Sequence, residues 1–240
     1  MVEEREDACP HIVLEELEIP QGSTGMPRQS FGPTAPVTVP QTSDPLRRAP
    51  EMFPESILHT NRLILRPFDA SDIPDTHASC ADALTQRWLP LPKPYTLDDA
   101  TNWCTTAAHA LRDSGDGIQF AVTDAYTKRL MGQVGLKKTD WRALVSEVGY
   151  WVSPWARGHG IAAEATRALA LWLLADQQFQ RLELRAATEN TASQKVALKA
   201  GFHPEGTLRN AGFVHGGRVD LVLFSMLPGD LAPPAQHYKS

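Results

Sequence analysis

The hydrophobic pattern switches between the two-residue period of a strand and the longer period of a helix several times along the chain. Near the start of the patterned region, Leu63 and Leu65 alternate with other residues over 62–67, as one face of a half-buried strand does. From residue 161 onward, apolar residues recur at about 3.6 residues, which is typical of one helical face. The same pattern predicts further strands over 118–123, 130–137, 146–153, 182–186, 203–211 and 217–227. Helices are predicted over 69–83, 96–112, 161–173 and 190–200.

The predicted order of elements is β-α-α-β-β-β-α-β-α-β-β. Strands joined by hairpin-sized links pair antiparallel, whereas the helix that begins at 161 is long enough to connect two parallel strands. These features predict an α+β (mixed α/β) fold, in which a central, mostly antiparallel sheet is flanked by helices and contains one β-α-β crossover. Gly201 follows the last predicted helix, where a left-handed C-cap residue is expected.

Composition separates residues 1–56 from the rest of the chain. This segment holds nine of the nineteen prolines, and ten acidic residues against four Lys or Arg. Such a segment buries too little apolar surface to offset the entropy lost on ordering, which predicts a Pro-rich acidic extension that is partly disordered. The folded domain is predicted over 57–230, followed by a short tail at 231–240.

Bulk properties argue against several classes of partner and cofactor. The formal net charge of −5 gives no general attraction to nucleic acid or to anionic membranes. No stretch approaches the roughly 20 apolar residues of a membrane span. The acidic N-terminus lacks the apolar core of a signal peptide, so a cytoplasmic protein is expected. The histidines and cysteines lack metal-ligand spacing, so no metal site is predicted.

Residues 157–162 (Arg-Gly-His-Gly-Ile-Ala) lie where a predicted strand turns into a predicted helix. The first amides of a helix have no partner within it and carry the positive end of its dipole, so they favour anions. Glycine lets the backbone close around a pyrophosphate, and Arg157 adds a cation. Residues 158–163 also fit a G-x-G-x-x-A dinucleotide fingerprint, and a purely structural glycine turn is a further alternative. The hairpin-linked strands before the turn weigh against a dinucleotide, because that fingerprint normally opens a parallel sheet.

Several blocks of the sequence resemble the GNAT superfamily of N-acetyltransferases, and in particular its RimJ/RimL-type branch. Arg157, Gly160 and Ala162 match the phosphate motif of the family, Gln/Arg-x-x-Gly-x-Gly/Ala. The other matching blocks are 60–67, 147–152, 190–202 and 216–225. Because these blocks occur in the family's order, the resemblance is more specific than the glycine turn alone.

The resemblance implies direct transfer of an acyl group from acetyl-CoA, or another acyl-CoA, to a primary amine. The amine is expected on a protein N-terminus or on a small molecule. Acyl-CoA is expected in a V between the strands at 147–153 and 181–187. The implied CoA contacts are Trp151, Val152, Arg157, Gly158, His159, Gly160, Ile161, Ala162, Asn190 and Ser193.

Catalysis of this transfer needs a neutral amine, a donor to the developing oxyanion and a donor to the departing thiolate. From the resemblance, Glu147 is the expected base, acting through a water. The alternative bases are His215, Asp220 and Glu189. Many members of the family carry a tyrosine where this chain has Ala197, so Ser193 is the nearest expected donor to the thiolate.

The acceptor and the reaction leave alternatives open. The acceptor is expected near 85–97 and 209–217, the loops that the motif constrains least. One alternative is a catalytically weak CoA-binding or regulatory module that recruits a partner through its N-terminal extension. Another is a larger acyl group such as succinyl, whose carboxylate would bind Arg209 or Arg218. A homodimer also remains open.

Overall fold

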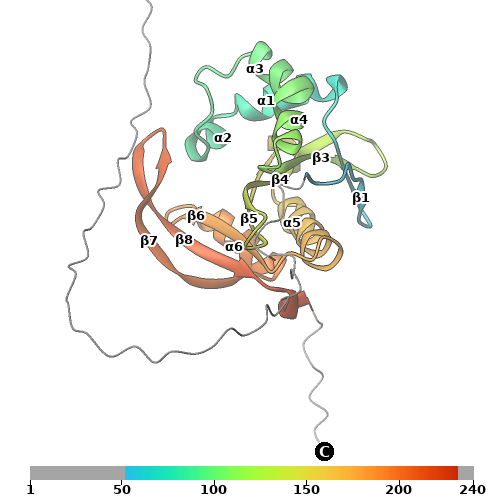
Figure 1. The fold of residues 1–240 in the computed structure, drawn as a ribbon. Helices are drawn as coiled ribbons and strands as arrows, with labels where there is room; N and C mark the ends of the chain where they lie inside the picture. The colour runs from blue at the N-terminus through green and yellow to red at the C-terminus, as the bar shows by residue number, and fades with distance from the viewer. Residues whose placement is uncertain (1–51, 232–240) are drawn as a thin grey trace, which may run out of the picture. The chain divides into compact units, whose positions relative to one another are not determined.

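The computed structural model describes residues 52–231 (Figure 1). Most of the predicted N-terminal extension and the predicted C-terminal tail lie outside this range. The strands are β1 (Leu58–His59), β2 (Leu63–Arg66), β3 (Ile118–Asp124), β4 (Leu130–Asp140), β5 (Val145–Val152), β6 (Arg181–Ala187), β7 (His203–Val214) and β8 (Gly217–Met226). The α-helices are α1 (Ile73–Cys80), α2 (Ala83–Trp88), α3 (Leu97–Asn102), α4 (Ala108–Asp113), α5 (Ile161–Leu171) and α6 (Thr191–Ala200). Shorter helical turns are η1 (Ala70–Asp72), η2 (Trp103–Ala107), η3 (Pro154–Ala156), η4 (Trp172–Asp176) and η5 (Pro228–Leu231).

One sheet contains all the described strands, in the order β1-β2-β3-β4-β5-β6-β8-β7. β5 and β6 run parallel, and every other pair of neighbours is antiparallel. The predicted mixed, mostly antiparallel sheet with one β-α-β crossover, here through α5, is therefore confirmed. The sequence pattern missed β1 and α2, which have two and six residues and are too short for a period to show.

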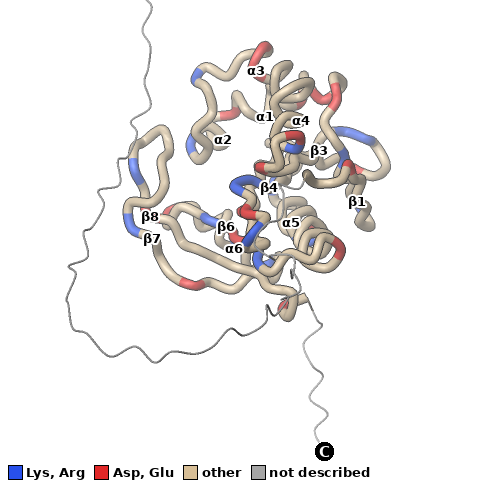
Figure 2. The backbone as a smooth tube through the Cα atoms, viewed as in Figure 1, with Lys and Arg blue, Asp and Glu red and all other residues tan. Residues whose placement is uncertain are grey.

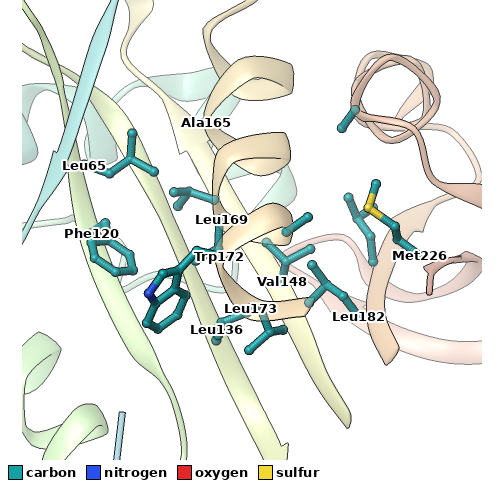
Figure 3. Packing of buried hydrophobic residues seen from close by; sticks show 14 of the residues in the cluster. Leu65, Phe120, Leu136, Val148, Ala165, Leu169, Trp172, Leu173, Leu182 and Met226 are labelled. Carbon is teal, nitrogen blue, oxygen red and sulfur yellow. The ribbon is translucent and has the colours of Figure 1, made fainter. Parts of the chain in front are cut away.

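The helices form layers on the two faces of the sheet, and α5 packs along the middle of one face. Leu169 on α5 and Leu173 on η4, which continues α5, are fully buried against strand residues that include Leu136 and Val148 (Figure 3). Burying a leucine side chain stabilises the fold by about 1.5–3 kcal/mol. This packing fixes α5, and with it the loop that enters α5 from β5.

The opposite face of the sheet is covered by α1, α3, η2 and α4. Their buried residues form a second cluster with strand residues, which includes Cys80, Cys104, Ala121 and Trp151. Val148 and Trp151 therefore face opposite sides, as an odd separation along a strand requires. Over residues 52–231, no helix is both long enough and apolar enough to cross a bilayer.

Candidate functional site

β5 and β6 pair along only part of their length. Their parallel ladder joins Val145–Val148 to Arg181–Leu184, although β5 continues to Val152 and β6 to Ala187. Beyond the ladder, β5 pairs only with β4, and β6 only with β8, among the described strands. The facing edges separate, and the backbone of Trp151 and Val152 lies on the separated part. This opening matches the V in which the family resemblance places acyl-CoA.

The loop from β5 into α5 suits an anion. Gly158 and Gly160 have φ angles of 81° and 77°, in the left-handed region where a side chain is unfavourable. Gly160 is the N-cap of α5 and offers no side-chain acceptor to the first amides of the helix. A Cβ at Gly158 would meet nothing within 4 Å, so the loop is open on that side. The free amides, the helix dipole and the open space together fit a pyrophosphate.

Arg157 contacts a carboxylate across the loop. Its Nη2 donates to Asp82 Oδ2 at 2.5 Å and to Thr85 Oγ1 at 3.0 Å. The hydrogen bond from Arg157 is the main reason that the pKa of Asp82 is lowered. Asp82 is also the N-cap of α2. Arg157 therefore ties the loop to α2, and its charge is offset by Asp82, which the sequence pattern did not reveal.

A second arginine holds the loop from the side of β2. Arg62 Nε donates to Glu164 Oε2 at 2.8 Å, and its Nη1 donates to the carbonyl oxygen of His159 at 3.2 Å. Thr60 donates to the other oxygen of Glu164 at 2.6 Å. His159 thus contributes its backbone to the structure of the loop. These contacts fix the shape of the loop before any ligand binds.

Ser193 meets a phenol that sequence analysis did not single out. Asn190 caps α6 by accepting from the Ser193 amide at 3.1 Å. The Tyr150 hydroxyl lies 2.8 Å from Ser193 Oγ and 3.2 Å from the Ser193 carbonyl oxygen. Burial raises the pKa of Tyr150 to about 12, so the phenol stays protonated near neutral pH. Strand alternation from Val148 gives the side to which Tyr150 points, but not its contact with α6.

Glu147 lies on the other side of β5, the side of Trp151. Its carboxylate is 3.1 Å from Lys137 Nζ, 3.0 Å from Lys138 Nζ and 3.6 Å from Arg185 Nε. Burial alone would raise the pKa of Glu147, but Lys137 and Lys138 lower it below its ordinary value. A carboxylate held in its ionised form is a weak proton acceptor. These ion pairs therefore weigh against Glu147 as the base.

An open cavity of about 800 Å³ lies between α2, the loop that follows α2 and the turn between β7 and β8. Figure 1 shows α2 facing the end of this hairpin. The cavity is lined by Ala81, Ala83, Gln86, Arg87, Lys93, Pro94, Tyr95, His215 and Gly216. Both segments in which the acceptor was expected, 85–97 and 209–217, contribute to this lining.

A family model described as an acetyltransferase (GNAT) domain matches residues 62–203, more than half of the chain. The chain belongs to the GNAT acetyltransferases. Among its relatives, the uncharacterized N-acetyltransferase YoaA of Bacillus subtilis is 28% identical over 176 residues, which cover 73% of this chain and 98% of YoaA. The ribosomal-protein-serine acetyltransferase of Escherichia coli is 28% identical over 98 residues, which cover 41% of this chain and 55% of that protein.

Solved structures share the fold of this GNAT acetyltransferase. RimL, a ribosomal L7/L12 α-N-protein acetyltransferase in complex with CoA, has a TM-score of 0.66 at 20% identity, covering 74% of this chain and 100% of RimL. RimJ of Mycobacterium smegmatis, in complex with CoA-disulfide, has a TM-score of 0.65 at 22% identity, covering 74% of this chain and 88% of RimJ. The predicted family, fold and acetyl-CoA co-substrate are confirmed. The roles of individual site residues stay predictions.

Of the three alternative bases in this GNAT acetyltransferase, only His215 is among the residues that line the cavity. Asp220 accepts a hydrogen bond from the Asn210 amide at 2.7 Å. The side chain of Glu189 is 80% exposed and lies 4.0 Å from Arg87. The structure thus brings His215, at the tip of the β7–β8 hairpin, to the space where the acceptor is expected.

Glu147→Gln is expected to destabilise the enzyme by about 1–3 kcal/mol at neutral pH, because a charge-assisted hydrogen-bonding partner of two lysines is lost. The folded-state pKa of Glu147 lies below its ordinary value of 4.5. Its contribution is therefore present above pH 4.5 and is lost as the pH falls through the folded-state pKa. Urea denaturation of both proteins across this range should show the difference in unfolding free energy shrinking in acid.

The same variant tests the predicted base. If Glu147 only forms ion pairs and does not act as the base, plots of kcat/KM against pH should be parallel for the variant and the wild type between about pH 6 and pH 9. A loss that is larger near pH 7 than near pH 9 would instead identify Glu147 as the base. Folding is checked on the same samples, so that a loss of stability is not mistaken for a loss of chemistry.

Proposed function

We propose that this GNAT acetyltransferase transfers the acetyl group of acetyl-CoA to the N-terminal amine of a protein or peptide. The observation that carries the proposal is the link between an anion-binding loop and an open cavity. Arg157 in the loop pairs with Asp82, and the neighbours of Asp82, Ala81 and Ala83, line the cavity. The two substrates are then bound on adjoining surfaces, as direct transfer requires.

A peptide acceptor is supported by the relatives and by the chemistry of the amine. The named relatives include a ribosomal-protein-serine acetyltransferase. The amine itself adds an argument. A peptide N-terminus has a pKa of about 7.7–8.0 and a lysine about 10.4, so the N-terminus is more often neutral when no strong base is present.

The co-substrate is held by backbone groups in this proposal. The first amides of α5 and the glycines of residues 157–162 bind the pyrophosphate, while Asn190 and Ser193 lie beside the pantetheine arm. The edge of β5 at Trp151 and Val152, which lacks a β6 partner, offers backbone groups to the pantetheine. Its N–H at Val152 is our candidate donor to the thioester oxygen, where negative charge develops during attack.

The departing sulfur is stabilised by a hydroxyl in the same proposal. The Tyr150 phenol lies 2.8 Å from Ser193 Oγ; we propose that it donates to this oxygen, which leaves the Ser193 hydroxyl free to donate to the sulfur. Tyr150 thus acts as a positioning residue and Ser193 as the catalytic residue. The phenol comes from β5, whereas the family tyrosine would stand on α6 at the position of Ala197.

A panel of acceptors tests the proposal. The purified full-length protein is incubated with acetyl-CoA and with peptides that have free N-termini, peptides with blocked N-termini and one lysine, or small amines. Thiol release should occur with the free N-termini, and mass spectrometry should find one acetyl group on the first residue. Tight CoA binding without turnover of any acceptor would favour the CoA-binding module. Faster turnover with succinyl-CoA would favour the larger acyl group.

A further inference from the structure

The cavity beside α2 has a cationic lining. Of its lining residues, two carry a full charge, and both are positive: Arg87 on α2 and Lys93 on the loop before α3. His215 lines the same space from the β7–β8 turn. The side chain of Arg87 is 63% exposed, so it is accessible to a ligand.

Carboxylates near this lining in the sequence or in space are occupied or solvated, and Asp98 is exposed. Asp82 accepts from Arg157 at 2.5 Å. Asp99 accepts from the Thr96 amide at 2.7 Å, and Asp220 accepts from a backbone amide of β7. Glu189 lies 4.0 Å from Arg87, but its side chain is 80% exposed, and such a surface pair is weak. The cations at the cavity are therefore left with little compensation.

The β7–β8 hairpin extends the positive surface away from the cavity. Arg209 lies on β7 and Arg218 on β8, and Arg218 Nη1 donates to the carbonyl oxygen of Asn210, the residue after Arg209, at 3.4 Å. Figure 2 shows Lys and Arg positions on α2, on the loop after it and on the β7–β8 hairpin. The cavity therefore has further cations on neighbouring elements.

We propose that the acceptor is a peptide with acidic residues directly after its N-terminal amine, and this inference rests on the proposed function. Arg87 and Lys93 bind the carboxylates of such a peptide through charge-assisted hydrogen bonds. This cationic cluster thus selects the acceptor by its charge.

Three peptides test the inference. They have the same length and the same first residue, and carry Glu, Gln or Lys at the second and third positions. The kcat/KM of the Glu peptide should exceed that of the Gln peptide by about tenfold at low salt, and that of the Lys peptide by more. The advantage should shrink as salt is raised, because the Debye length falls to about 8 Å at 0.15 M ionic strength.

Paired variants assign the preference to these residues. In the double variant Arg87→Gln, Lys93→Gln, the Glu and Gln peptides should become equal within about twofold. The matched control is Lys128→Gln with Arg142→Gln, which removes two exposed cations from other turns and should keep the full preference. Thermal melts establish that all variants are folded. A preference that survives loss of Arg87 and Lys93 would overturn the assignment.

The outcomes separate this inference from the proposed function. Equal acetylation of all three peptides would overturn the acidic preference and leave N-terminal acetylation standing. Acetylation of none of them would contradict the proposed function itself. Free glutamate is included as a further acceptor. If it is acetylated as efficiently as the Glu peptide, the acceptor is not required to be a peptide, and that part of the inference is overturned.

Discussion

Gly160→Glu is expected to weaken the binding of acetyl-CoA by about a hundredfold or more, because it adds a carboxylate where the pyrophosphate should bind. Gly160 is the N-cap of α5 and has a φ angle of 77°. A side chain in this backbone region also costs about 1–2 kcal/mol, which disturbs the loop. Titration calorimetry with CoA measures the change in affinity.

Gly206→Glu is the matched control for this variant. Gly206 also has a positive φ angle, 152°, and a Cβ there would meet nothing within 4 Å. It lies on β7, at the edge of the sheet away from the loop. Both variants introduce the same residue into a strained position, but only the one at Gly160 should lose CoA affinity. Unchanged CoA affinity in a folded Gly160→Glu protein would show that the pyrophosphate does not bind at this loop.

Ser193→Ala is expected to lower kcat by about a hundredfold, the lower end of what a positioned proton donor contributes, with little change in the KM for acetyl-CoA. The hydroxyl stabilises the thiolate only as the C–S bond breaks, so its loss affects the chemical step more than binding. Steady-state thiol-release kinetics measure both constants. A kcat close to that of the wild type would show that the thiolate leaves without this donor.

Tyr150→Phe separates the positioning role from the catalytic one. It should lower kcat by about tenfold in the wild-type background and very little in the Ser193→Ala background, because a positioning residue acts only through its partner. Thr191→Ala, in the same turn of α6 and exposed, is the control and should retain full activity. Because burial raises the pKa of Tyr150 to about 12, this phenol should not titrate in the working pH range.

The sequence was informative where a feature depends on neighbouring residues. The strand alternation, the glycine turn before α5 and the left-handed Gly201 after α6 are local patterns, and the structure contains all of them. Segments 85–97 and 209–217, where the sequence predicted the acceptor, both contribute to the cavity lining. They were chosen because the motif constrains these loops least.

The missed features depend on residues that are far apart in the chain. The sequence around Arg157 shows no partner for its charge, because Asp82, with which it pairs, lies 75 residues earlier. Tyr150 and Ser193 are 43 residues apart and meet only because α6 packs beside the separated part of β5. The lysines around Glu147 come from β4, so the lowered pKa of that carboxylate could not be inferred from its own strand.

The ion pair between Arg157 and Asp82 also bears on how the two substrates influence each other. It joins the loop beside the first turn of α5 to the residue that caps α2. In the proposed function, each substrate would bind next to one partner of the pair. In that arrangement, a change in this contact caused by acetyl-CoA would change the affinity for the acceptor, and by thermodynamic reciprocity the acceptor would change the affinity for acetyl-CoA by the same factor. This one ion pair would thus couple the two substrates.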